Sequence, residues 1–285
     1  MVEPTHEQLK KMKALELEML ASFVEVCRKL SLRYYLVGGT LLGAVRHQGF
    51  IPWDDDIDVA MPRQDYEIFL REGQKHLPEH CFLQSLYTDP AYTMNFAKIR
   101  DCRTTFVEYA VRKYPMNHGL FIDIFPLDGY PREKREQKTM DLQQKIFKFR
   151  ARAAVEVPKA AQHSFPVELG LNAIAALTCL RYPRLRGALE AREKIQSAAV
   201  NTDTWANYCG AWGKKEIMPA AWYGRGAELT FEGLTVMGPE HWDKWLTQVY
   251  GDYMQLPPAE KRIGHHYAEV IDLETPCGEY LKTLR

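Results

Sequence analysis

The chain has 285 residues, which is enough for one large domain or two small ones and for a full hydrophobic core. Its 46% hydrophobic and 26% charged residues exclude the disordered, collagen-like and low-complexity classes. Because 37 Lys and Arg balance 37 Asp and Glu, the chain lacks an overall basic field, and we expect no nucleic-acid partner. Six isolated cysteines without a CxxC pair predict free thiols in a reducing compartment. Residues 1–30 carry charges throughout and show no secretory signal, so we expect a cytoplasmic protein.

The first part of the chain predicts alternating helices and strands. Thr5 and Gln8 fit a capping box at the start of a helix over residues 6–30. Thr40 is expected to cap a short helix that ends at His47. A further helix is expected over 65–77. Apolar runs predict strands over residues 34–37, 57–61 and 120–125, and a pair of strands over 96–100 and 104–107.

The second part predicts mostly helices. We expect a basic helix over 133–156 and another that begins near Pro239 and stops at Gly251. The pattern indicates an α/β fold of the α+β type, a mixed β-sheet flanked by helices with an added helical section. The predicted parts are a catalytic core over 1–130, a basic helical section over 131–200 and a C-terminal part over 201–285 that completes the active site.

The most unusual motif is the acidic run Trp53-Asp-Asp-Asp-Ile-Asp58. Four carboxylates in five positions repel one another unless water or a cation compensates them. Alternation along a strand places Asp56 and Asp58 on one face and Ile57 in the core. Asp123 interrupts an apolar strand, where an unpaired charge is costly. The three carboxylates predict a site for a hard divalent cation, Mg²⁺ or Mn²⁺.

The acidic run has two other interpretations. It can be a polar turn before a strand, but that leaves the alternation unexplained. It can be an EF-hand loop that starts at Asp54, but Val59 stands where that loop needs glycine.

Gly38 and Gly39 end one expected strand and open a helix. Glycines allow a phosphate to approach the backbone, and a helix N-terminus offers free N–H groups to an anion. With Thr40 they are predicted to shape a phosphate pocket, although an ordinary turn explains the glycines alone. The combination with three Asp residues is typical of metal-dependent phosphoryl or nucleotidyl transfer.

Several cations and an aromatic residue are candidates for substrate contacts. Arg46 is expected to bind a phosphate or to brace Asp54 or Asp55. Lys98 and Arg100 share one strand face and suit a nucleotide diphosphate, with surface ion pairs as the alternative. The expected substrate-binding residues are Trp53, by stacking or cation–π contact, and Arg262 and His265 in a C-terminal loop. Core packing of Trp53 and a structural role for His265 stay open.

Several motifs resemble the LicD family of bacterial phosphocholine transferases, which is related to fukutin and fukutin-related protein. Residues 36–59 read LVGGTLLGAVRHQGFIPWDDDIDV, a long and specific match. The likeness continues in FAKIRD (96–101) with Thr104-Thr-Phe106, GLFIDIFPLD (119–128), YGDYM (250–254), LPP (256–258), and Arg262 with His265. Residues 131–230 are poorly covered. The Gly-Gly turn lies further from the paired Asp residues than in the compact nucleotidyltransferase motif, although the family shares this longer link.

The resemblance implies a nucleotidyltransferase-like fold and a metal-binding catalytic triad of Asp56, Asp58 and Asp123. It implies metal-dependent transfer of a phospho-alcohol, typically phosphocholine from CDP-choline, to a glycan hydroxyl with release of CMP. The expected acceptor is a cell-surface glycan such as teichoic acid or lipopolysaccharide, in lipid-linked form. The alternatives are a nucleotidyltransferase that transfers NMP and a non-catalytic nucleotide- or glycan-binding protein. The alcohol, the acceptor hydroxyl, the number of metal ions, the general base and the oligomeric state stay open.

Residues 145–194 form a basic section. They contain ten Lys and Arg and four Glu, a difference of +6. Within them the uncharged run 169–180 is too short for a membrane span, which needs about 20 residues. We interpret the run as a buried helix with a solvated basic rim. The alternative is peripheral contact with an anionic surface at the inner face of the membrane.

Overall fold

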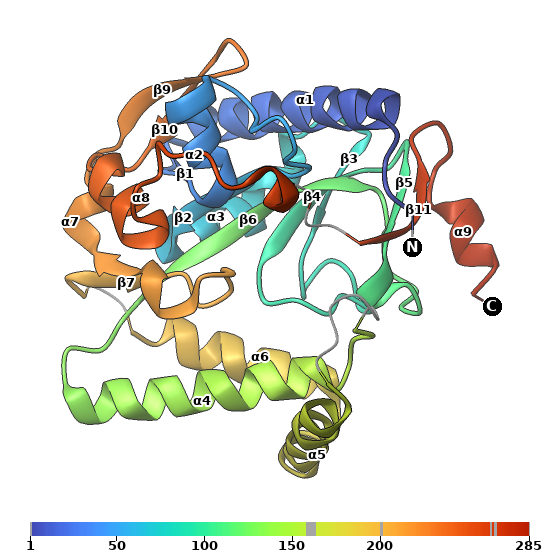
Figure 1. Ribbon diagram of the computed structural model, residues 1–285, viewed down its shortest axis with the longest axis vertical. Helices are drawn as coiled ribbons and strands as arrows, with labels where there is room; N and C mark the ends of the chain where they lie inside the picture. The colour runs from blue at the N-terminus through green and yellow to red at the C-terminus, as the bar shows by residue number, and fades with distance from the viewer. Residues whose placement is uncertain (1, 158–163, 200–201, 263, 265–266, 285) are drawn as a thin grey trace.

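The computed structural model describes residues 2–157, 164–199, 202–262, 264 and 267–284. A mixed seven-stranded sheet lies at its centre, flanked by helices (Figure 1). The sheet has the order β1-β2-β6-β4-β3, and β7 and β8 extend it from the end of β6. Its strands are β1 (Tyr35–Leu36), β2 (Asp58–Pro62), β3 (Cys81–Gln84), β4 (Ala97–Asp101), β6 (Leu120–Gly129), β7 (Thr204–Ala206) and β8 (Ile217–Pro219). Two antiparallel pairs complete the strands: β5 (Thr105–Glu108) with β11 (Ala268–Asp272), and β9 (Ala227–Phe231) with β10 (Leu234–Gly238).

The α-helices include those predicted from the sequence and two short ones in the C-terminal part that were not predicted. They are α1 (His6–Leu30), α2 (Gly38–His47), α3 (Arg63–Glu72), α4 (Lys134–Arg152), α5 (Phe165–Arg181), α6 (Leu185–Ser197), α7 (Ala220–Tyr223), α8 (Trp242–Tyr250) and α9 (Gly278–Lys282). The mixed sheet with flanking helices confirms the predicted fold class. All six cysteines lie in the described ranges and are free, as predicted.

The long helix α1 begins and packs as its sequence indicates. Thr5 N donates to Gln8 Oε1 (3.0 Å), and Gln8 N donates to Thr5 Oγ1 (3.2 Å), which completes the capping box. Its apolar stripe, with Met12 and Phe23 fully buried, joins the main core. The rings of Phe23 and Phe69 of α3 lie edge to face, 5.1 Å apart, so α1 and α3 share one layer of the core.

The sheet has one apolar face and one polar face in its centre. Val59 of β2 is in register with Ile124 of β6, and both side chains are fully buried in the core. Because side chains alternate along each strand, their neighbours Asp58 and Asp123 share the opposite face. This second face is the one on which the predicted catalytic residues gather.

Two local predictions are corrected. The strands predicted over 96–100 and 104–107 exist as β4 and β5 but do not pair with each other. β4 lies between β3 and β6, so no free edge remains for β5, which pairs with β11 instead. Thr40 is not the N-cap of α2, because that helix begins at Gly38 after Val37.

The apolar run 169–180 lies in α5, and the buried-helix interpretation is wrong. Of the residues of α5 only Ala175 is buried. Figure 1 shows α5 beyond α4, on the side away from the central sheet. Among the described residues, no helix is both long and apolar enough to cross a bilayer.

Candidate active site

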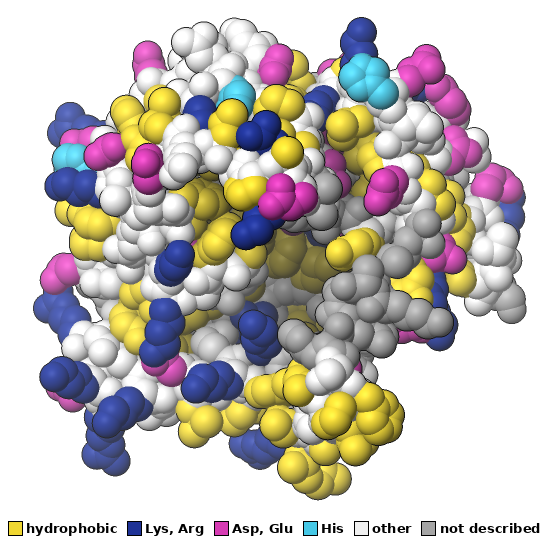
Figure 2. All heavy atoms as spheres, viewed as in Figure 1, with side chains coloured by type: hydrophobic (Ala, Val, Ile, Leu, Met, Phe, Trp, Pro, Cys, Tyr) yellow, Lys and Arg dark blue, Asp and Glu magenta, His cyan; other side chains and the backbone are white. Residues whose placement is uncertain are grey.

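A pocket of about 1110 Å³ opens on the polar face of the sheet. Its walls come from β2, β4, β6, the start of α2, and the segments 207–216 and 250–261. Figure 2 shows a hollow in the middle of the viewed face. The predicted residues that line the pocket are Gly38, Gly39, Arg46, Trp53, Asp56, Asp58, Lys98 and Asp123. Thr40, Arg100 and Arg262 are not part of its lining, and His265 lies outside the described residues.

A row of polar residues crosses four neighbouring strands at the base of the pocket. Asp58 of β2 is in register with Asp123 of β6. Asp123 is in turn in register with Lys98 of β4, and Lys98 with Gln84 of β3. Residues in register on adjacent strands lie about 5 Å apart with side chains on the same face. The β-sheet therefore brings the two predicted catalytic carboxylates and one cation together without any loop.

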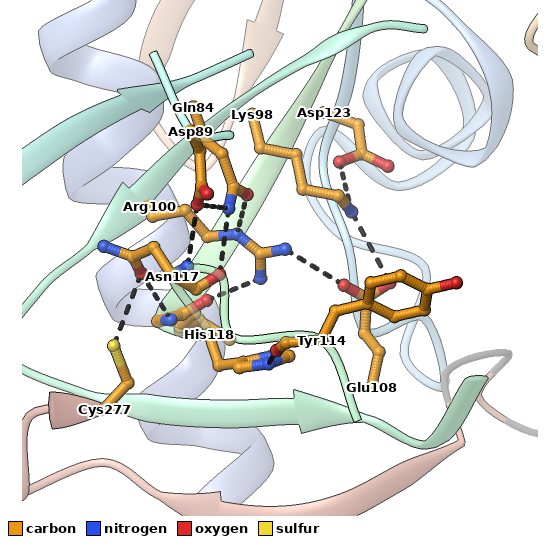
Figure 3. Close-up of polar contacts among 12 residues, drawn as sticks. Gln84, Asp89, Lys98, Arg100, Glu108, Tyr114, Asn117, His118, Asp123 and Cys277 are labelled. Atoms are coloured by element: carbon orange, nitrogen blue, oxygen red, sulfur yellow. Dashed lines mark hydrogen bonds and ion pairs between the residues drawn. The ribbon is translucent and has the colours of Figure 1, made fainter. Parts of the chain in front are cut away.

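The ammonium group of Lys98 compensates the negative charge of two carboxylates. Its Nζ lies 2.8 Å from Asp123 Oδ1 and 3.6 Å from Glu108 Oε1, as Figure 3 shows. The ammonium also lies 3.2 Å from the centroid of the Phe121 ring. The Lys98 side chain is 1% exposed, so each of these contacts acts at low local dielectric. We therefore assign to Lys98 the role of compensating the charge of Asp123 and holding that side chain in place.

Arg100 is corrected from a phosphate-binding residue to a positioning residue. Its side chain is fully buried, and its Nη2 lies 3.1 Å from Glu108 Oε2 (Figure 3). Its Nε donates to Gln84 Oε1 (2.7 Å) and its Nη1 to the carbonyl oxygen of Gly119 (2.8 Å). These three partners hold the guanidinium in the protein interior. There it fixes the position of the Glu108 carboxylate at the pocket wall.

The two glycines at the start of α2 make room for carboxylates. A Cβ atom at Gly38 would lie 2.7 Å from Asp58 Oδ2, and one at Gly39 would lie 2.4 Å from Asp54 Oδ2. Gly38 also has φ +57°, which side chains rarely adopt. Thr40 Oγ1 accepts a hydrogen bond from Asp58 N (2.8 Å) and so fixes the start of β2. The α2 N-terminus thus lies against negative charge, which the helix dipole stabilises.

Three carboxylates of the acidic run lie close together just before the start of β2. Asp54, Asp55 and Asp56 each offer an oxygen within 4.8 Å of the other two. Within the described ranges, the predicted triad of Asp56, Asp58 and Asp123 does not form a group of that spacing, although all three line one pocket. The donors on this wall are carboxylate oxygens, the ligands that Mg²⁺ and Mn²⁺ prefer, so the residues fit such an ion.

Lys13 of α1 holds the turn that precedes the acidic run. Its Nζ donates to the carbonyl oxygens of Ile51 (3.1 Å) and Pro52 (3.0 Å). Burial lowers the pKa of Lys13, while the charges of nearby Asp54 and other carboxylates oppose that shift. The N-terminal helix therefore contributes a cation to the support of the acidic loop.

The far wall of the pocket contains residues that the sequence analysis missed. Glu216 accepts a hydrogen bond from the backbone N–H of Trp212 (2.9 Å) and another from Asn207 Nδ2 (2.9 Å). Burial raises the pKa of Glu216 to about 7, and the two hydrogen bonds oppose the shift. The ring of Trp212 lies edge to face with that of Tyr250, 5.0 Å between centroids. No periodicity or motif marks Glu216 or Trp212, which only the folded chain brings to the site.

Tyr250 connects this wall to the acidic one. Burial, together with the carboxylates of Asp58 and Asp54, raises the pKa of Tyr250, so its hydroxyl stays protonated and is a donor. Tyr250 belongs to the sequence motif YGDYM (250–254), so the sequence did mark this residue. No local pattern indicated that it lies in the pocket.

The C-terminal segment lies against α2 and Trp53. Arg46 Nη1 donates to the carbonyl oxygen of Tyr253 (2.7 Å). The Arg262 guanidinium carbon lies 5.5 Å from the centroid of the Trp53 ring, and Arg262 Nε donates to the carbonyl oxygen of Pro257 (2.9 Å). Arg46 therefore joins the pocket to this segment, and Trp53 lines the pocket with Arg262 beside it.

Comparisons with known proteins identify the family of this chain. The family model described as LicD/FKTN/FKRP, nucleotidyltransferase domain, matches residues 31–167, which hold all three predicted catalytic carboxylates. The chain is 33% identical over 258 residues to the lipopolysaccharide cholinephosphotransferase LicD of Haemophilus influenzae, covering 90% of this chain and 95% of the relative. It is 48% identical over 42 residues to the human ribitol 5-phosphate transferase FKRP, covering 15% of this chain and 8% of the relative. The resemblance found in the motifs is confirmed: this chain belongs to the LicD family.

Proposed function

We propose that this protein transfers phosphocholine from CDP-choline to a hydroxyl of a cell-surface glycan, such as lipopolysaccharide or teichoic acid, and releases CMP. The observation that carries the proposal is the pairing of Asp58 with Asp123 in the wall of a large pocket. The names of the relatives support the reaction class, since one is a cholinephosphotransferase and the other a ribitol 5-phosphate transferase. Both relatives are thus named for the transfer of a phospho-alcohol, and one of them for the transfer of choline.

The pocket residues suggest how the groups are arranged. Asp56, Asp58 and Asp123 would hold Mg²⁺ or Mn²⁺, which when bound neutralises the donor diphosphate. Asp123, which is ion-paired with Lys98, accepts the proton of the acceptor hydroxyl. The hydroxyl oxygen then bonds to the phosphorus that carries choline. The bond from that phosphorus to the bridging oxygen breaks, and CMP leaves with the electron pair.

The aromatic wall suits the alcohol of the donor. Trp53, Trp212 and Tyr250 line the same pocket, and aromatic faces attract quaternary ammonium groups. The carboxylate of Glu216 lies in that wall as well. These residues favour choline over an uncharged polyol such as ribitol.

A product assay separates this proposal from its alternatives. The protein is incubated with Mg²⁺ and CDP-choline labelled in choline and in cytidine, with and without a lipopolysaccharide acceptor. We expect choline label in the glycan and cytidine label in CMP, only when acceptor is present. Cytidine label in the glycan would show transfer of NMP instead. Binding of the donor without any product would identify a non-catalytic binding protein.

A further inference from the structure

Helix α5 exposes an apolar surface that no described part of the chain covers. Phe165 is 79% exposed and Leu180 is 82% exposed, at opposite ends of the helix. Figure 2 shows hydrophobic side chains gathered over α5, at the bottom of the view. Single exposed apolar residues are ordinary, but a contiguous group on one helix marks a contact surface. The large apolar side chains exposed on α5 are Phe165, Val167, Leu169, Ile174, Leu177 and Leu180.

The charge around this helix is positive. The single acid of α5, Glu168, is 15% exposed and forms an ion pair with Arg152. The neighbouring acids Glu190 and Glu193 are also paired with arginines. Figure 2 shows Lys and Arg side chains next to the apolar group and along α4. Four of the exposed cations lie on or next to these helices. Lys145 and Lys148 belong to α4, Arg181 is the last residue of α5, and Arg184 follows three residues later.

We propose that α5 and its basic surroundings dock this protein on an anionic lipid surface. The 17 residues of α5 extend about 25 Å, which is shorter than the roughly 30 Å of a hydrocarbon core, so the helix lies in the interface and does not cross it. Its apolar side chains enter the headgroup boundary, while the Lys and Arg side chains contact lipid phosphates. A second copy of this chain fits less well, because two such basic faces repel each other.

The position of α5 relative to the pocket determines where a docked protein meets its substrate. The hollow seen in Figure 2 opens on the same face that carries α5. A protein docked through α5 therefore presents its pocket beside the membrane surface. If the proposed function holds, the acceptor is a glycan attached to a lipid; the docking itself is independent of that function.

Vesicle sedimentation of the full-length protein tests the proposal without any activity assay. We expect binding to vesicles of phosphatidylglycerol and phosphatidylcholine at low salt, and little binding to vesicles of phosphatidylcholine alone. Leu177→Gln with Leu180→Gln should reduce binding at least tenfold. Arg181→Gln with Arg184→Gln should reduce it about 30-fold, since each cation near the surface contributes about fivefold. Raising the salt to 1 M should abolish binding, because the Debye length falls to about 3 Å.

Matched variants on another surface provide the control. Arg28→Gln with Lys29→Gln removes the same charge from α1, which Figure 1 shows at the opposite end of the molecule, and should bind as the unaltered protein does. Equal binding to both vesicle types, or equal loss in the α1 control, would overturn the proposal. A dimer that Leu177→Gln converts to a monomer, without any vesicle binding, would also overturn it and identify a self-association surface.

Discussion

Asp58 of β2 and Asp123 of β6 are in register on two adjacent parallel strands, so their carboxylates leave the same face of the sheet side by side. Two like charges this close are unfavourable unless a cation compensates them. Lys98, the next residue in the same row, supplies one such charge from β4. The site is therefore built on the rigid centre of the sheet, and its charge balance is part of the fold.

Replacing Lys98 tests that balance. Lys98→Met leaves Asp123 and Glu108 without their shared ammonium in a buried place, and we expect it to lower the free energy of unfolding by about 3–5 kcal/mol at pH 7. Chemical denaturation measures the loss. Lys138→Met on the exposed side of α4 is the control and should change stability by less than about 0.5 kcal/mol. A loss below about 1 kcal/mol for Lys98→Met would contradict the assigned role.

Replacing Gly39 tests the contact between α2 and the acidic run. In Gly39→Ala the new Cβ would lie 2.4 Å from Asp54 Oδ2, so the carboxylate must move, at a cost of about 1–3 kcal/mol. Gly187→Ala in α6 meets no atom within 4 Å and should be stabilising by about 0.5–1 kcal/mol. Thermal unfolding of the two variants gives the comparison. Equal stability of both variants would contradict the close approach of Asp54 to Gly39.

The buried Glu216 predicts a pH dependence of stability. Its pKa is raised from 4.5 to about 7 in the folded protein, so the folded state binds the proton more tightly than the unfolded state. Its stabilising contribution is complete below pH 4.5 and is lost as the pH rises to 7. The stability of the unaltered protein relative to Glu216→Gln should therefore fall by up to about 3 kcal/mol over this range, at about 1.4 kcal/mol per pKa unit.

The control for this pH profile is Glu228→Gln on the exposed surface of β9. That variant should follow the unaltered protein at every pH. A difference between the unaltered protein and Glu216→Gln that does not change with pH would show that Glu216 ionises normally.

A metal-binding site predicts stabilisation by the ion alone. Mg²⁺ or Mn²⁺ should raise the melting temperature by mass action, because the ion binds only the folded arrangement of carboxylates. In Asp58→Asn this increase should be lost, whereas Asp203→Asn, which changes an exposed side chain, should keep it. An undiminished increase in Asp58→Asn would place the ion elsewhere.

Much of the core could be predicted because its signals are local. The capping box at Thr5, the alternation around Asp58 and the interrupted strand at Asp123 each depend on residues close together in the chain. The polar face of the sheet follows from the alternation of side chains along each strand, which places every second residue on the same face. The family resemblance also depends on continuous motifs, and it is confirmed.

The rest depends on contacts between distant residues. The partner of β5 is β11, which lies at the other end of the chain, and no local pattern encodes that pairing. Arg100 shares a strand face with Lys98 as predicted, but only the packed structure shows that its guanidinium is buried with Glu108. Glu216 reaches the pocket through tertiary contacts that leave no periodic signal. The proposed domain boundaries at 130 and 200 stay predictions.

The role of the two carboxylates is tested most directly by the rate of CMP release from CDP-choline, with Mg²⁺ and a glycan acceptor, in Asp58→Asn and Asp123→Asn. We expect each variant to lose at least about 1,000-fold in kcat, while circular dichroism and the melting temperature show a folded protein. Asp203→Asn should retain the full rate. A folded Asp58→Asn or Asp123→Asn variant that keeps its rate within tenfold would contradict the claim that this pair of carboxylates carries the reaction.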